Sequence, residues 1–200
     1  MDEQAVIMKA SGILGRHLVV TAAAIVLLAG CTGRAALQPV PSFALTNQSG
    51  RAIHAEDLRG RAVIISFIFT RCHEVCPLVT VQLARAQAEA RSAGMSSAVR
   101  FVSITVDPAI DTPDVLQRYA ARFGADTATW DFLTGHPDEV GRVVREMGVF
   151  TANDRGRLGH GNLVLFVNPR GEIVRRYTDL EHLSAQILEE VRRLRRPERG

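Results

Sequence analysis

The stretch AVIISFIFTRCHEVCPLVTVQLARAQAEA, residues 62–90, decides the fold. Its first part, Ala62–Phe69, is apolar and rich in β-branched and aromatic residues, which is typical of a strand buried on both faces. This strand leads directly into Cys72 and Cys76. After the cysteines, apolar residues recur at helical spacing from Pro77 to about Ala93 and predict a helix.

The same alternation of strands and helices continues along the chain. Apolar runs predict strands at Val99–Val106, Trp130–Leu133, Leu163–Val167 and Glu172–Tyr177, the last two forming a hairpin. Helices are predicted to start at Thr112–Pro113 and to span Pro137–Met147 and Leu180–Leu194. We therefore expect an α/β fold, a mixed sheet with helices on both faces. The order of strand, cysteine pair and helix is similar to that of thioredoxin-like proteins.

The N-terminal region has the features of an export signal. Basic residues precede the apolar run Leu18–Leu28, and Leu28-Ala29-Gly30-Cys31 resembles a bacterial lipobox. This resemblance implies cleavage before Cys31, lipidation of Cys31 and a membrane-tethered domain. The predicted organisation is a signal peptide at 1–30, a linker at 31–41, one domain at 42–196 and a tail at 197–200, with translation starting at Met1 or Met8.

Charge and compartment narrow the classes of function. The formal net charge is only +3, which does not predict binding to nucleic acid. Export to the periplasm, or to another extracytoplasmic space, places the domain in an oxidising environment. With Cys31 assigned to lipid, Cys72 and Cys76 form an isolated pair.

The cysteine pair allows three kinds of chemistry. Pro77 predicts that Cys76 lies at the helix cap, where free backbone amides would stabilise its thiolate. The spacing permits a disulfide, so the bond is either a structural staple or a reversible redox pair. In the reduced state the two sulfurs are soft metal ligands.

A third ligand is predicted at His160. It lies in the glycine-rich run Leu158–Asn162, which we expect to be a loop directly before the strand at Leu163–Val167. In a thioredoxin-like sheet this loop faces the cysteine pair. Two thiolates and one imidazole suit Cu(I), and a further weak ligand adapts the set to Cu(II). We expect the other histidines to be solvated or to cap helices.

A series of motifs resembles one family over about Pro41–Leu194. The series comprises FTRCHEVCP at 69–77, VSITVDP at 102–108, DTP at 111–113, His160 before a strand, and NPRG at 168–171. It resembles the Sco/SenC copper chaperones of cytochrome c oxidase assembly. The resemblance implies a thioredoxin fold, copper bound by Cys72, Cys76 and His160, and delivery of copper to, or thiol reduction of, the dinuclear copper centre of the oxidase.

The expected partners follow from this resemblance. They are a copper-accepting oxidase subunit, a copper donor, a thiol reductant and the membrane that holds the lipid. Two positions depart from the family pattern: His73-Glu74 follows the first cysteine, and Gly159 stands where an aspartate commonly precedes the histidine. His73 and Glu74 are candidates to assist the site, as are Asp107 and Asp111, although turn and cap roles also explain the two aspartates.

Other functions fit the cysteine pair. The main alternative is a thiol-disulfide reductase, which needs a reducing partner in an oxidising compartment. A peroxidase is disfavoured because Phe69 occupies the position of the usual peroxiredoxin threonine. A structural zinc site normally needs four ligands, and His73 is poorly placed as the fourth. A copper sensor or resistance protein would use the same residues as a chaperone.

Overall fold

The computed structural model describes residues 37–149, 151–154, 157–160 and 162–195; for residues 151–154, 157–160 and 195 it describes the backbone. The main sheet is built from β1 (Gln38–Pro39), β2 (Ala44–Asn47), β3 (Ala52–His54), β4 (Ala62–Ile68), β5 (Val99–Thr105), β6 (Trp130–Thr134), β9 (Val164–Val167) and β10 (Glu172–Tyr177). These strands follow the order β1-β10-β9-β4-β5-β6-β2-β3. Strands β4, β5 and β6 run parallel, whereas β9 is antiparallel to β4.

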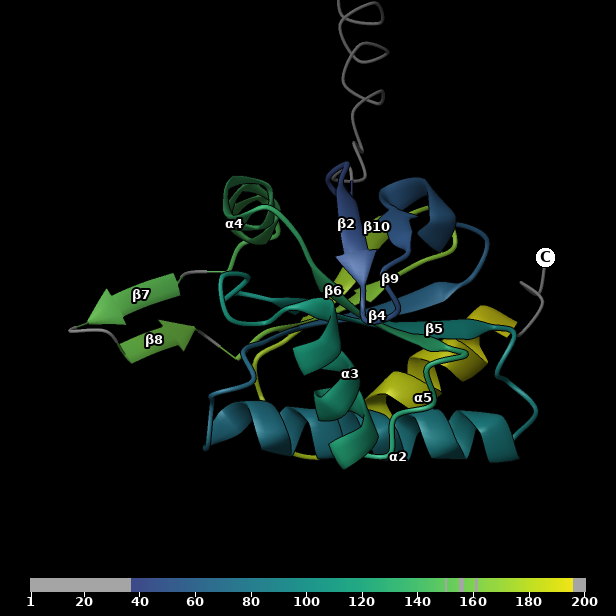
Figure 1. The fold of residues 1–200 in the computed structure, drawn as a ribbon. Coiled ribbons are helices and arrows are strands. Elements are labelled where there is room, and N and C mark those ends of the chain that lie inside the picture. Colours follow the sequence, from purple (N-terminus) through teal and green to yellow (C-terminus); the bar gives the residue numbers. More distant parts are fainter. Residues whose placement is uncertain (1–36, 150, 155–156, 161, 196–200) are drawn as a thin grey trace, which may run out of the picture. The chain divides into compact units, whose positions relative to one another are not determined.

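Helices cover both faces of this sheet. They are η1 (Ala55–Leu58), α2 (Val75–Ser92), α3 (Pro113–Arg122), α4 (Pro137–Glu146) and α5 (Leu183–Arg195). Helices α2, α3 and α5 lie on one face and α4 on the other (Figure 1). The predicted α/β architecture, a mixed sheet between two helical layers, is thus confirmed.

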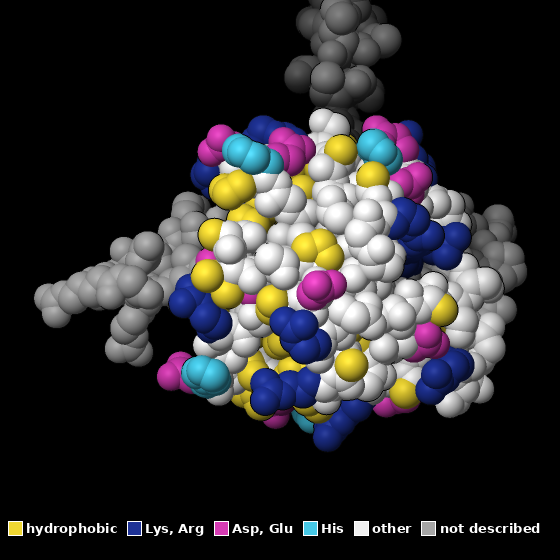
Figure 2. All heavy atoms as spheres, in the orientation of Figure 1, with side chains coloured by type: hydrophobic (Ala, Val, Ile, Leu, Met, Phe, Trp, Pro, Cys, Tyr) yellow, Lys and Arg dark blue, Asp and Glu magenta, His cyan; other side chains and the backbone are white. Residues whose placement is uncertain are grey.

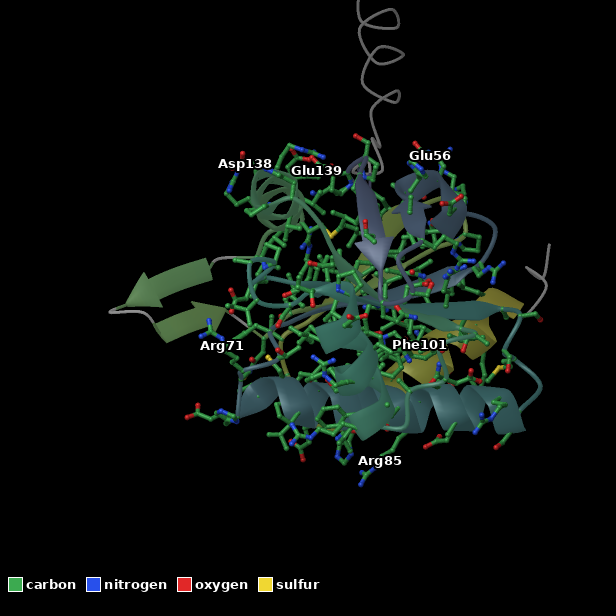
Figure 3. All side chains as sticks on the ribbon, viewed as in Figure 1. Glu56, Arg71, Arg85, Phe101, Asp138 and Glu139 are labelled. Carbon is green, nitrogen blue, oxygen red and sulfur yellow. The ribbon has the colours of Figure 1, made fainter. Side chains whose placement is uncertain are left out.

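Strand β4 explains why both layers form. Its seven residues are all buried, and their side chains alternate between two cores. Ile64 and Ile68 pack with the α2, α3 and α5 side, which includes Phe101, labelled in Figure 3. Ile65 and Phe67 pack with the α4 side. A strand with apolar side chains on both faces requires cover on both, which is why its sequence is continuously apolar.

The topology brings three connections to one edge of the sheet. Because β5 is parallel to β4, the segment after Thr105 lies beside the segment after Ile68. Because β9 is antiparallel to β4, its first residue, Val164, pairs with Ser66 near the end of β4. The chain entering β9 therefore approaches the edge from which the cysteine loop leaves.

Several elements differ from the sequence prediction. The first three strands were not predicted, and part of the predicted 31–41 linker belongs to the sheet, because Gln38 pairs with Ile173 of β10. The expected loop around His160 is instead β8 (Arg157–His160), which pairs with β7 (Thr151–Asp154) in a separate two-stranded sheet. There the backbone of His160 pairs with that of Thr151, although the run is rich in glycine.

The predicted signal peptide and Cys31 lie outside the described residues, as does the predicted tail at 197–200. Within the part of the chain that is described, none of the helices combines the length and the apolar character that crossing a bilayer requires.

Candidate metal centre

The cysteine loop connects β4 to α2. The backbone N–H of Cys72 donates to the carbonyl of Phe69 at 3.0 Å, which turns the chain after the strand. Helix α2 starts at Val75, with Glu74 as its N-cap, so Cys76 lies in the first turn and not at the cap as predicted. Pro77 is compatible with this start, because the first amides of a helix have no partner within it.

The two thiols have different environments. Cys72 is half-buried and Cys76 is buried, and no disulfide joins them in the structure. The backbone N–H of Cys76 points at the Cys72 sulfur, 3.4 Å away. The Cys72 sulfur therefore lies over the start of α2, where unpaired amides favour negative charge.

This arrangement differs from the predicted one, in which the helix start stabilises the Cys76 thiolate. Burial raises the pKa of Cys72, but hydrogen bonds from the backbone amides of Cys76, Glu74 and Val75 outweigh it, and the net pKa is lowered. Burial raises the pKa of Cys76 to about 12, and the neighbouring Cys72 sulfur adds to this effect. Cys72, not Cys76 as the sequence suggested, is the thiol that the helix start stabilises as a thiolate.

Alkylation rates should reveal this asymmetry. A pKa about three units above the ordinary value of 9.0 lowers the thiolate fraction of Cys76 at neutral pH about a thousandfold. A thiolate of higher pKa is also a stronger nucleophile, and this offsets about half of the effect on a logarithmic scale. We therefore expect iodoacetamide at neutral pH to modify Cys76, in Cys72→Ser, at least about thirtyfold more slowly than Cys72 in Cys76→Ser. Equal rates in the folded state would contradict the assignment. In denaturant both variants should react alike.

The stability of the reduced protein should fall at alkaline pH. Below pH 9.0 the thiol of Cys76 is protonated in both folded and unfolded chains, so its contribution is fully present. Above that pH the unfolded thiol ionises first, and stability declines by up to about 1.4 kcal/mol per pH unit until about pH 12. Cys72, with its lowered pKa, acts in the opposite sense and loses its contribution as pH falls.

Denaturant unfolding between pH 8 and 11 measures this decline. The only lysine in the chain is Lys9, so no lysine of the described domain titrates in this range. Burial also raises the pKa of Tyr119, which adds a loss of the same sign. Cys76→Ser should remove the Cys76 part of the slope and retain the Tyr119 part. An unchanged slope in this variant would contradict the role given to Cys76.

A buried carboxylate supports the cysteine loop from the neighbouring strand connection. Asp111 is fully buried and accepts hydrogen bonds from the backbone N–H of Thr70 at 3.1 Å and from the hydroxyls of Thr70 and Thr105, each at 2.5 Å. Asp107 forms an ion pair with Arg71 at 2.7 Å. Figure 3 labels Arg71 on the side of the molecule where α2 begins. Both aspartates thus hold the residues directly before Cys72.

A hydroxyl chain joins the first turn of α2 to α3. The Thr80 hydroxyl donates to the carbonyl of Cys76 at 2.8 Å. Its oxygen lies 2.8 Å from the Tyr119 hydroxyl, and because the Thr80 proton is already used, Tyr119 is the donor. This contact, which the sequence analysis did not identify, fixes α3 against the helix turn that carries Cys76.

Among the side chains that the structure describes, the other candidate ligands are not gathered around the thiols. His73 and Glu74 are exposed on the cysteine loop. Among the described residues, no group of three histidine, cysteine or acidic side chains is close enough to hold a metal ion. The backbone of His160 ends β8, four residues before β9 enters the sheet at the thiol edge; its side chain lies outside what the structure describes.

The fold determines the environment of the thiol pair. A thiol pair stands between a central strand and the helix that follows it, with a lowered pKa on the first sulfur and a buried second sulfur, in a sheet covered on both faces. A model of the SCO1/SenC family matches residues 32–196. The chain belongs to the SCO1/SenC family.

Solved structures agree with this membership. A SCO1/SenC family lipoprotein from Bacillus anthracis is 27% identical and superposes with a TM-score of 0.73, covering 80% of this chain and 96% of its own. Copper-bound ScoI from Arabidopsis thaliana is 26% identical with a TM-score of 0.67, covering 76% and 98%. BsSco, described as a cytochrome c oxidase assembly protein with a disulfide switch, is 27% identical with a TM-score of 0.69, covering 78% and 92%.

Proposed function

We propose that this protein is a copper metallochaperone that loads, or reduces the thiols of, the dinuclear copper centre of cytochrome c oxidase during its assembly. The observation that carries the proposal is the placement of the two cysteines at the start of α2, with the Cys72 sulfur held 3.4 Å from the Cys76 amide. Family membership supports it, as do the copper bound to the Arabidopsis relative and the assembly role described for BsSco.

Copper would be held by the sulfurs of Cys72 and Cys76 and the imidazole of His160. Two thiolates and an imidazole are soft ligands in a number that suits Cu(I). The sequence position of His160 supports its inclusion, because the chain runs from β8 to Val164 at the same sheet edge as the cysteines. Four extended residues span at most about 14 Å, so His160 stays within one loop length of that edge.

The chain's own residues suit transfer of a metal cargo. Cys72 is partly exposed and readily forms a thiolate, so it presents a ligand that a recipient's sulfur can displace. Cys76 is buried and holds its proton, which must leave when metal binds. Loading should therefore release protons and become tighter as pH rises.

Copper titration of the reduced and oxidised chain tests the proposal. The reduced protein should bind about one Cu(I) per chain, because three soft ligands make one low-coordinate site. Oxidation to the Cys72–Cys76 disulfide removes both thiolates and should abolish binding. If the reduced chain binds no copper against a chelator of moderate affinity, the proposal is wrong.

A second candidate, a thiol-disulfide reductase, is favoured by the unequal pKa values. The Cys72 thiolate would attack a substrate disulfide and release one substrate thiolate, and the Cys76 sulfur would then attack Cys72 and release the second. The pair loses two electrons and the substrate gains two, so a thiol reductant must restore it. Turnover with such a reductant that is unaffected in His160→Ala would favour this candidate.

We also propose that Cys31 is lipidated and tethers the domain to the bacterial envelope, facing outside the cytoplasm. The motif Leu28-Ala29-Gly30-Cys31 and the lipoprotein relative from Bacillus anthracis support this. Mass spectrometry of the membrane fraction, with Cys31→Ala as the control, should find acyl chains on the wild type and not on the variant.

A further inference from the structure

We propose that the surface beside Cys72 includes a docking pocket for an acidic side chain of the partner protein that meets the thiols. This proposal deepens the proposed function, since it names the chemistry of the partner. The pocket, of about 220 Å³, is lined by Thr70, Val115, Arg118, Tyr119 and Arg122. Thr70 stands two residues before Cys72, so the pocket borders the cysteine loop.

One face of α3 forms a wall of the pocket. Val115, Arg118, Tyr119 and Arg122 follow one another at helical intervals along a single face of α3. Tyr119 fixes this wall to α2 through its bond to Thr80. Thr70 is fixed by partly buried hydrogen bonds to Asp111, so hydrogen bonds hold both sides of the pocket.

Charge identifies the occupant. Arg118 and Arg122 are exposed, and within the described part of the chain neither forms an ion pair or a hydrogen bond. Arg71, by contrast, is already paired with Asp107. Figure 2 shows basic side chains in dark blue over the region that α3 occupies in Figure 1. Two unpaired guanidinium groups around a hollow suit a carboxylate, which they bind with directional hydrogen bonds.

Exposed apolar side chains in the segments next to Cys76 and Asp111 suit a protein partner better than a small anion. Leu78, two residues after Cys76, is 61% exposed, and Ile110, next to Asp111, is 43% exposed. Exposed large apolar residues close to a reactive group are typical of contact surfaces between proteins. The partner segment should therefore carry an acidic residue with apolar neighbours.

Peptide probes can test this surface without copper. Each probe carries one cysteine as a mixed disulfide with 2-thiopyridine, an adjacent leucine, and Glu, Gln or Lys at a chosen distance from the cysteine. The Cys72 thiolate bonds to the peptide sulfur and expels 2-thiopyridone, whose absorbance gives the rate. Cys76 then displaces the peptide thiol, so the pair is oxidised and the probe is reduced.

The full chain in detergent should react about tenfold faster with the best-placed Glu probe than with its Lys counterpart, within the range of electrostatic effects on association. Arg118→Gln with Arg122→Gln should remove this preference. The matched control is Arg61→Gln with Arg145→Gln, which removes the same amount of positive charge and should retain the preference. Arg61 directly precedes β4, and Arg145 lies on α4, which covers the opposite face of the sheet from α3. Thermal melting checks that both double variants fold.

Two outcomes would overturn the docking pocket. One is an undiminished preference in the Arg118 and Arg122 variant. The other is a preference that does not depend on the position of Glu, because long-range attraction alone would produce it. A chain that fails to bind copper but prefers the Glu probe would refute the copper role and leave the pocket supported, so the two proposals fail separately.

Discussion

Replacing either Cys72 or Cys76 by serine should weaken Cu(I) binding by roughly two hundredfold or more. Structural zinc sites with four protein ligands bind with about 10–16 kcal/mol, so one ligand accounts for about 3 kcal/mol on average, which is about two hundredfold. Thiolates are the softest ligands that proteins offer to Cu(I), so each sulfur should contribute at least this average. Competition with a chromophoric Cu(I) chelator measures the change.

The same titration ranks the three ligands. His160→Ala should weaken binding less than either cysteine variant, since imidazole is the harder ligand of the set. His136→Ala is a matched control, because His136 is exposed and precedes α4, which covers the face of the sheet opposite α2. Affinity equal to that of the wild type in His160→Ala would remove His160 from the site. Loss of affinity in His136→Ala would show that the assay reports general damage to the protein.

Replacing Asp111 by alanine should lower the free energy of unfolding by about 3 kcal/mol. The change leaves the Thr70 amide and the Thr70 and Thr105 hydroxyls without their acceptor in a buried region, and each unsatisfied buried group costs about 1–3 kcal/mol when water cannot replace the partner. Partial access of water at Thr70 keeps the total near the lower end of the sum. Urea unfolding of the reduced protein measures the loss.

A second acidic residue nearby serves as the control for Asp111. Asp114 is exposed in the first turn of α3 and forms no hydrogen bond or ion pair within the described part of the chain, so its charge contributes mainly through the helix dipole. Asp114→Ala should therefore cost less than about 1 kcal/mol. Because Asp111 holds Thr70, its loss should also slow the reaction of Cys72 with iodoacetamide, a change that Asp114→Ala should not cause. Equal destabilisation by the two variants would contradict the supporting role of Asp111.

Local sequence signals were sufficient for most of the core elements. The apolar run at 62–69 predicted β4 because every residue of that strand is buried. Thr112-Pro113 predicted the start of α3, where Thr112 is the N-cap and Pro113 the first helical residue. The turn Asn168–Gly171 predicted the hairpin of β9 and β10, since Gly171 adopts a positive φ of 82°.

The shortest strands, and contacts with distant parts of the chain, could not be predicted. Strands β1 and β3 have two and three residues, and they form through pairing with β10 and β2. Too few residues are present for a periodic pattern to appear. The prediction that the helix start stabilises the Cys76 thiolate was wrong for a similar reason. Cys76 is buried by packing across α2, α3 and the sheet, and nothing in the CHEVCP sequence indicates which sulfur will face the amides.

Asp111 illustrates the limit for the site. In the sequence DPAIDTP it reads as a turn residue directly before a helix, and the structure does place a turn there. Its main contacts reach Thr70, 41 residues earlier in the chain. They arise only because β4 and β5 are parallel neighbours, so that the loops that follow them meet.

Because β7 and β8 form a separate sheet, the strand that carries the third proposed ligand, His160, is independent of the strand pairing of the main sheet. Neither strand pairs with the eight-stranded sheet, so the register of that sheet does not depend on the residues of the hairpin. A hairpin from a relative can therefore be exchanged between α4 and β9 without redesigning the core. Libraries of such chimeras could tune metal selectivity while the cysteine pair and its helix stay constant.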